Sequence, residues 1–110
     1  LTPREAMGLL MDGEVRPSLA ADADPDAWWA AADDLVARVV ARGRVVARLR
    51  EPRASGHYTV EAALVEHPDL PAGEVYALLY SRAGGSPRVY RCTPEAARLA
   101  LEDHGIFNLA

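Results

Sequence analysis

A proline directly after a residue that can cap a helix occurs three times in this chain, and this feature most constrains the fold. The three pairs are Thr2-Pro3, Asp24-Pro25 and Thr93-Pro94. A Thr or Asp side chain can accept a hydrogen bond from a free amide of the first helical turn, and proline suits the first helical position. Each pair therefore predicts the start of a helix.

Glycines set the expected ends of the three helices. The first is expected to end at Asp12-Gly13, and the second, which is the longest, at Gly43. The third is expected to run from Pro94 to His104 and to end at Gly105. Apolar residues recur with a helical period in each segment, and glycine after such a run is a common helix stop.

Between the second and third helices the apolar pattern changes to alternation, which is typical of half-buried strands. Strands are expected over Arg44 to Arg50, His57 to Glu66, Glu74 to Arg82 and Arg88 to Cys92. A second helix that continues through Gly43 is the alternative for the first of them. The order α-α-β-β-β-β-α favours one α+β domain over residues 1–110, with an antiparallel sheet of about four strands and the helices packed on one face.

The last two strands are expected to form a hairpin, because Ala83-Gly84-Gly85-Ser86-Pro87 is a typical hairpin connection. If Arg82 faces Arg88 in this hairpin, Tyr80 faces Tyr90 and Leu78 faces Cys92. The tyrosine pair would then help to hold the register of the two strands.

Charge is segregated along the chain, whose net charge is −4. Residues 12–34 hold seven acids and one arginine, and residues 38–53 hold six arginines and one acid. These segments could each attract a partner of opposite charge, or they could neutralise each other within the fold. Asp34 and Arg38 are four residues apart in the favourable order for a helical ion pair. Nucleic acid is an unexpected partner, because the net charge is negative and the arginines lack interleaved aromatic residues.

Residues that could carry catalysis are few. Cys92 is the single cysteine, so an internal disulfide and a multi-cysteine zinc site are excluded, and a cytoplasmic location is expected. The sequence contains no P-loop, dinucleotide fingerprint, nucleophile elbow or H-E-x-x-H motif, and it predicts no cofactor, no metal site and no membrane segment. An enzyme would have to use His57, Glu61 or Cys92. Cys92 is more simply explained as a small apolar residue between the sheet and the last helix.

Two adjacent tryptophans are the most informative surface candidates. Trp28 and Trp29 point about 100° apart on a helix, so a narrow apolar stripe cannot bury both, whereas a broad core face could cover both. Tryptophan is enriched at protein interfaces. On a strand, Arg44, Arg48 and Arg50 would project from one face, where an acidic partner could relieve their repulsion.

These observations favour a small non-catalytic domain that binds a protein partner, such as a regulator, an immunity- or antitoxin-like inhibitor, or an adaptor. The partner could be a second copy of the chain, with Trp28, Trp29, Arg44, Arg48 and Arg50 at the contact. The first alternative is a small-ligand-binding domain whose pocket is lined by Trp28, Tyr76, Tyr80 and Tyr90. The second alternative is the small enzyme with His57, Glu61 or Cys92.

Overall fold

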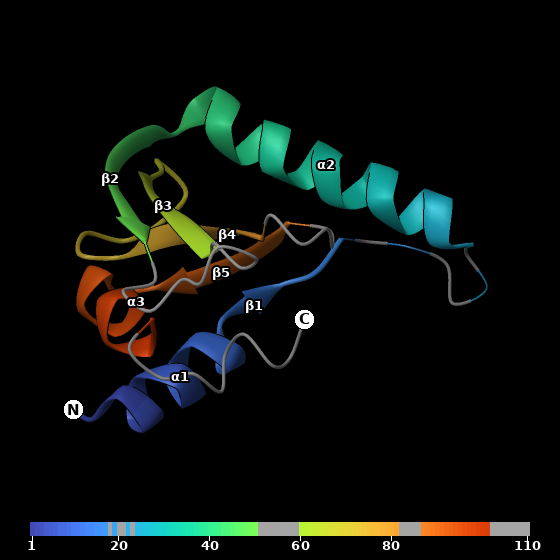
Figure 1. Ribbon diagram of the computed structural model, residues 1–110. Coiled ribbons are helices and arrows are strands. Elements are labelled where there is room, and N and C mark those ends of the chain that lie inside the picture. The colour runs from blue at the N-terminus through green and yellow to red at the C-terminus, as the bar shows by residue number, and fades with distance from the viewer. Residues whose placement is uncertain (18, 20–21, 23, 51–59, 82–86, 102–110) are drawn as a thin grey trace.

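The chain folds into three helices and one antiparallel sheet of five strands, seen in a computed structural model that describes residues 1–17, 19, 22, 24–50, 60–81 and 87–101 (Figure 1). The elements in chain order are α1 (Pro3–Asp12), β1 (Glu14–Val15), α2 (Pro25–Arg42), β2 (Arg44–Arg50), β3 (Val60–Glu66), β4 (Val75–Ser81), β5 (Arg88–Cys92) and α3 (Pro94–Ala100). The spatial order of the strands is β1-β5-β4-β3-β2. The predicted α+β class is confirmed.

The three helix starts are confirmed by their caps. The Thr2 hydroxyl accepts a hydrogen bond from the Glu5 amide at 3.1 Å, and the Glu5 carboxylate accepts one from the Thr2 amide at 3.0 Å. Asp24 accepts from the Ala27 amide at 2.8 Å. Thr93 accepts from the Ala96 amide at 3.2 Å. The part of the predicted third helix after residue 101 lies outside the described residues.

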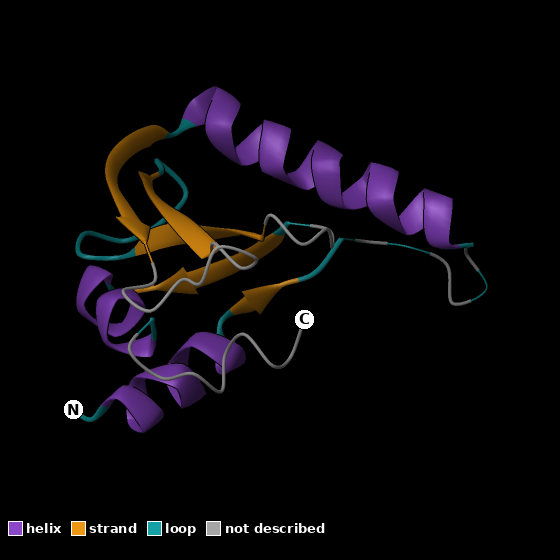
Figure 2. Cartoon of the chain, viewed as in Figure 1, coloured by secondary structure: helices purple, strands orange, loops and turns teal. Residues whose placement is uncertain are grey.

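The helices cover both faces of the sheet, which corrects the expectation that they pack on one face (Figure 2). On the face that we call the α1/α3 face, Leu10 of α1 and Ala97 of α3 pack with Leu64 and Tyr90. On the opposite face, the α2 face, Val39 packs with residues that include Ala63, Val65 and Leu78. Strand β3, which lies between β4 and β2, is therefore buried on both sides, and Ala62 to Val65 form an uninterrupted buried run.

Strands β4 and β5 pair as predicted, but in a different register. Tyr90 lies opposite Ala77, Cys92 opposite Val75 and Arg88 opposite Leu79. The predicted pairs of Tyr80 with Tyr90 and Leu78 with Cys92 are therefore wrong. The observed register differs from the predicted one by an odd number of residues. Residues of β4 and β5 that were expected to share a face therefore lie on opposite faces of the sheet. It puts Tyr90 and Cys92 with Ala77 on the α1/α3 face, and Leu78 with Val89 on the α2 face.

Strand β2 contains a bulge that divides its arginines between the two faces. Val45 pairs with Val65 and Ala47 with Leu64, so Val46 is an extra residue in β2. Arg44 lies opposite Glu66, in line with Leu64 on the α1/α3 face, whereas Arg48 lies opposite Ala63 on the α2 face. The expectation that all three arginines share one face is wrong because the bulge interrupts the alternation. Arg50 is paired through its backbone with Glu61.

Several predicted features lie outside the described residues: residues 57–59 at the start of the second predicted strand, the connection through Gly84-Gly85, and the end of the last helix with His104. Within the ranges that are described, none of the helices has the length and apolar character needed to cross a membrane.

Candidate functional site

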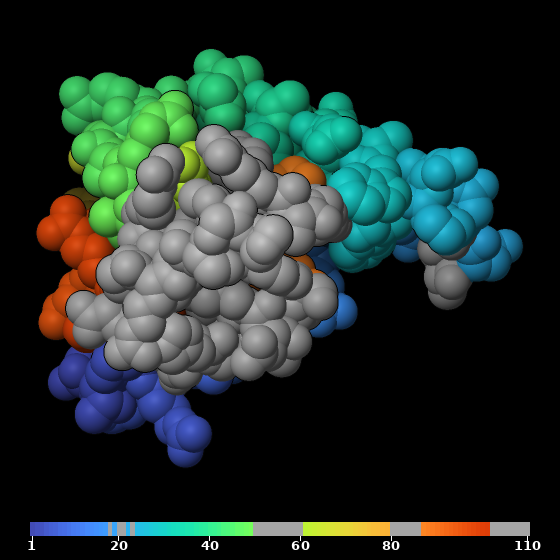
Figure 3. All heavy atoms as spheres, viewed as in Figure 1, coloured from blue at the N-terminus to red at the C-terminus, as the bar shows by residue number. Residues whose placement is uncertain are grey.

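The N-terminal end of α2 carries both tryptophans on the surface. Trp28 belongs to the stripe of α2 that faces the sheet, because Ala32, Leu35 and Val39 follow it at helical spacing. Trp29 lies about 100° around the helix from this stripe. Their exposed fractions are 40% and 43%. In Figure 3 this end of α2, coloured cyan, projects beyond most of the described chain.

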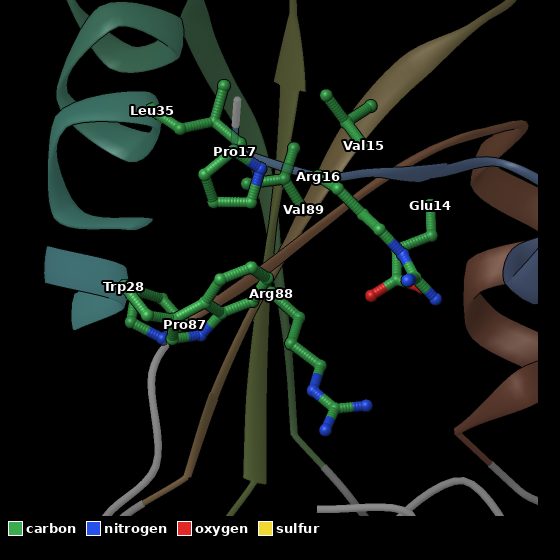
Figure 4. A pocket seen from close by; sticks show the side chains of 9 residues that line it. All are labelled: Glu14, Val15, Arg16, Pro17, Trp28, Leu35, Pro87, Arg88 and Val89. Carbon is green, nitrogen blue, oxygen red and sulfur yellow. The ribbon is translucent and has the colours of Figure 1, made fainter. Parts of the chain in front are cut away.

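A hollow of about 250 Å³ lies between this end of α2 and the neighbouring ends of β1 and β5 (Figure 4). Trp28 and Pro87 border it on one side, and Glu14 and Arg16 on another. The remaining lining residues are Val15, Pro17, Leu35, Arg88 and Val89. The lining therefore combines apolar side chains with the charged side chains of Glu14, Arg16 and Arg88.

The size and rim of the hollow suit a side chain better than a free small molecule. Ligand pockets usually enclose roughly 300–1,000 Å³, and this hollow is smaller, at about 250 Å³. Its rim charges include the Arg16–Glu14 ion pair, with a 3.3 Å separation between Nη2 and Oε2. An inserted apolar side chain could contact the Trp28 ring while the rim stays solvated.

The aromatic residues proposed for a ligand pocket do not converge. Tyr90 is buried on the α1/α3 face, opposite the face on which Trp28 and α2 lie, and burial raises the pKa of its phenol, an effect that a hydrogen bond with Arg88 partly offsets. Tyr76 packs on the α2 face and makes an edge-to-face contact with His67, with ring centroids 5.2 Å apart. Tyr80 lies opposite Glu61 in the backbone register. The structure therefore does not unite these residues in one pocket with Trp28.

The residues proposed for catalysis also lie apart. Cys92 is buried on the α1/α3 face, and burial, reinforced by the charge of Glu74, raises the pKa of its thiol to about 12. A thiol with this pKa is a poor nucleophile near neutral pH. Glu61 lies at a register position of the opposite face, in line with Ala63. His57 lies outside the described residues, and no group of three metal-ligating side chains occurs among those that are described.

Much of the predicted basic segment is neutralised within the fold. The Asp34–Arg38 pair is confirmed, with 2.7 Å between Arg38 Nη2 and Asp34 Oδ2. Arg44 pairs with Glu66 at 2.7 Å. Arg42 lies 3.6 Å from Asp69. Arg48 is exposed on the edge strand β2.

The hollow contains functional candidates that sequence reasoning missed, above all Val15, Pro87 and Arg88. They become neighbours of Trp28 only because β1 pairs with β5 across 75 intervening residues, Glu14 opposite Tyr90. No local pattern in the sequence signals that pairing. Comparison of the chain with known protein families, with curated proteins and with solved structures finds no match.

Proposed function

We propose that this chain is a non-catalytic protein-binding domain whose contact surface is the projecting N-terminal end of α2. The observation that carries the proposal is the exposure of two adjacent tryptophans, 40% and 43%, beside a hollow of side-chain size. A tryptophan left in water forgoes a large apolar burial, and tryptophan is the residue type most enriched at interface hot spots. A protein partner that covers Trp28 and Trp29 would recover this burial.

The rest of the site supports binding over catalysis. The hollow offers one aromatic wall and an ion-paired rim, and Cys92, the one thiol, is enclosed in the opposite layer of the core. The regulator, inhibitor and adaptor roles expected from the sequence all require such a surface. They differ in the identity of the partner.

The experiment is capture of interacting proteins from the native cells by a tagged chain, with quantitative mass spectrometry. The double variant Trp28→Ala/Trp29→Ala is compared with wild type, and Leu9→Ala is the matched control because Leu9 is an exposed apolar residue of α1. We expect at least one protein to be lost with the tryptophan variant and retained with the control. Identical capture by all three proteins, at equal melting temperature, would refute the proposal.

A further inference from the structure

We infer that the partner of α2 is a second copy of this chain, packed against the first with the two α2 helices antiparallel about a two-fold axis. The inference rests on the proposed function, since it names the partner of the same surface. Two patches at opposite ends of α2, which complement each other in apolar character and in charge, lead to it.

The first patch, the N-terminal patch, consists of Trp28 and Trp29 with the acids Asp24 and Asp26. All four residues are exposed. Asp24 is the N-cap and Asp26 lies in the first turn, so the patch is negative. A partner of this patch should present apolar side chains flanked by positive charge.

The second patch, the C-terminal patch, lies where α2 passes into β2. It consists of Val40, Val45 and Val46, all at least 40% exposed, with Arg48, which is exposed on the α2 face of β2. Its chemistry is the one that the N-terminal patch requires. Among the described residues, the two patches hold every large exposed apolar side chain except Leu1 and Leu9.

The helix itself aligns the two patches. Trp29 and Val40 are eleven residues apart, which is about three turns, so they lie on the same flank of α2, about 16 Å apart along its axis. When two α2 helices pack antiparallel along this flank, Trp29 of each copy faces Val40 of the other. The acids of each N-terminal patch then face the β2 corner of the other copy, where Arg48 is exposed.

Other arrangements of two copies fit less well. A parallel arrangement would bring Trp29 onto Trp29 and Asp26 onto Asp26, so like charges would face each other. A head-to-tail arrangement would use one patch of each copy and leave the other two uncovered, which leads to open chains. Only the antiparallel two-fold arrangement covers both patches of both copies and closes at the dimer.

The contact is small, and this sets the expected affinity. The 18 residues of α2 span about 27 Å. One helix flank with the β2 corner provides less than the roughly 800 Å² per partner of a standard stable interface. We therefore expect a dimer that dissociates in the micromolar range, and that weakens as salt rises because its charged groups are exposed.

Sedimentation velocity over a concentration series tests the inference. We expect the wild type to shift from monomer to dimer, and Trp29→Ala to raise the dissociation constant at least about tenfold. Leu9→Ala, which lies outside both patches, should leave the dissociation constant unchanged. Circular dichroism melting of each variant separates lost association from lost folding.

The geometry has its own test, because Asp33 lies close to the proposed axis on the same side of α2 as Trp29 and Val36. Asp33→Cys should form an intermolecular disulfide under mild oxidation, whereas Glu95→Cys on α3 should not, and the native thiol of Cys92 is buried. A crosslinked dimer specific to position 33 supports the antiparallel arrangement.

A monomer at every concentration, a dimer indifferent to Trp29→Ala, growth beyond the dimer, or equal crosslinking at positions 33 and 95 would each overturn the inference. The first of these results, combined with a foreign protein lost by the tryptophan variant in the capture experiment, would leave the proposed function standing. If the tryptophan variant loses nothing in either experiment, both fail.

Discussion

Replacing Gly13 with alanine should weaken the contact between β5 and the segment that joins α1 to β1. Gly13 lies between α1 and β1, and its carbonyl accepts a hydrogen bond of 2.7 Å from the Arg91 amide of β5. A Cβ at Gly13 would overlap the carbonyl oxygen of Arg91, which is backbone and cannot rotate away. Its φ is −94°, so alanine is acceptable in conformation and the obstacle is the close approach of β5.

The expected loss of stability can be worked from these contacts. Relief of the overlap requires Gly13 to move away from β5, which costs about 1–3 kcal/mol as overpacking and about 1 kcal/mol as a lost backbone hydrogen bond. Alanine has a lower conformational entropy than glycine in the unfolded chain, which offsets about 0.4–1 kcal/mol of this loss of stability. The net destabilisation is about 1–3.5 kcal/mol, or roughly 5–20 °C in melting temperature for a chain of this size.

Urea unfolding followed by circular dichroism measures this difference, and Gly8→Ala is the matched control. Gly8 lies inside α1, and a methyl group added there would meet nothing within 4 Å, so alanine should stabilise by about 1 kcal/mol through helix propensity. A Gly13→Ala protein within about 0.5 kcal/mol of wild type would refute the reasoning, because that is the scatter of neutral surface substitutions.

Four other outcomes follow from the burial and the charges described above. The thiol of Cys92 should react with iodoacetamide much more slowly in the folded protein than in urea at pH 8, since burial raises its pKa to about 12. The pKa of the Cys92 thiol is higher in the folded than in the unfolded chain, so the stability that it contributes is complete below about pH 8.5 and is lost as the pH rises toward 12. Urea midpoints of the wild type should therefore fall over that pH range, and those of Cys92→Ala should fall less steeply. Leu64→Ala should cost about 2–5 kcal/mol because Leu64 is fully buried, whereas Leu9→Ala at a 53% exposed position should cost less than about 0.5 kcal/mol by the same denaturation assay. Asp33→Asn should lower the dissociation constant of the proposed dimer in sedimentation, because two Asp33 carboxylates lie near its axis, and an unchanged or higher constant would contradict that geometry.

The features of the fold that the sequence predicts are the local ones. The caps Thr2, Asp24 and Thr93 act within their own helical turn, so their residue types suffice to predict where the helices begin. The order of helical and alternating segments likewise predicts the α+β class. Helix geometry leaves two possibilities for Trp28 and Trp29, a broad core face that covers both or a place at the surface, and both are substantially exposed.

The features that the sequence does not predict depend on neighbours that are distant along the chain. Ala62 to Val65 are apolar on both faces, so no alternation indicates that helices cover both sides of β3. The bulge at Val46 puts Arg44 and Arg48 on opposite faces of the sheet. The sequence of β2 predicts a regular strand and does not signal this bulge. The hollow beside Trp28 requires the pairing of β1 with β5, which two residues of β1 cannot signal by periodicity.

The packing of α1 on α3 has a consequence for the order in which the chain can fold during synthesis. The buried side of α1, formed by Ala6 and Leu10, packs against Tyr90 of β5 and against Ala97 and its neighbours in α3. These contacts join residues 6–10 to residues 90–100, so α1 is made well before the elements against which it packs.

While the ribosome makes the intervening residues, α1 lacks its partners in β5 and α3, and β1 lacks the strand with which it pairs. A chain released before residue 88 would keep these groups exposed to other chains and to proteases. Arrest of translation at successive lengths should therefore show protease protection of α1 only after β5 and α3 have left the exit tunnel. This fold therefore cannot be completed before residues 88–100 have been made.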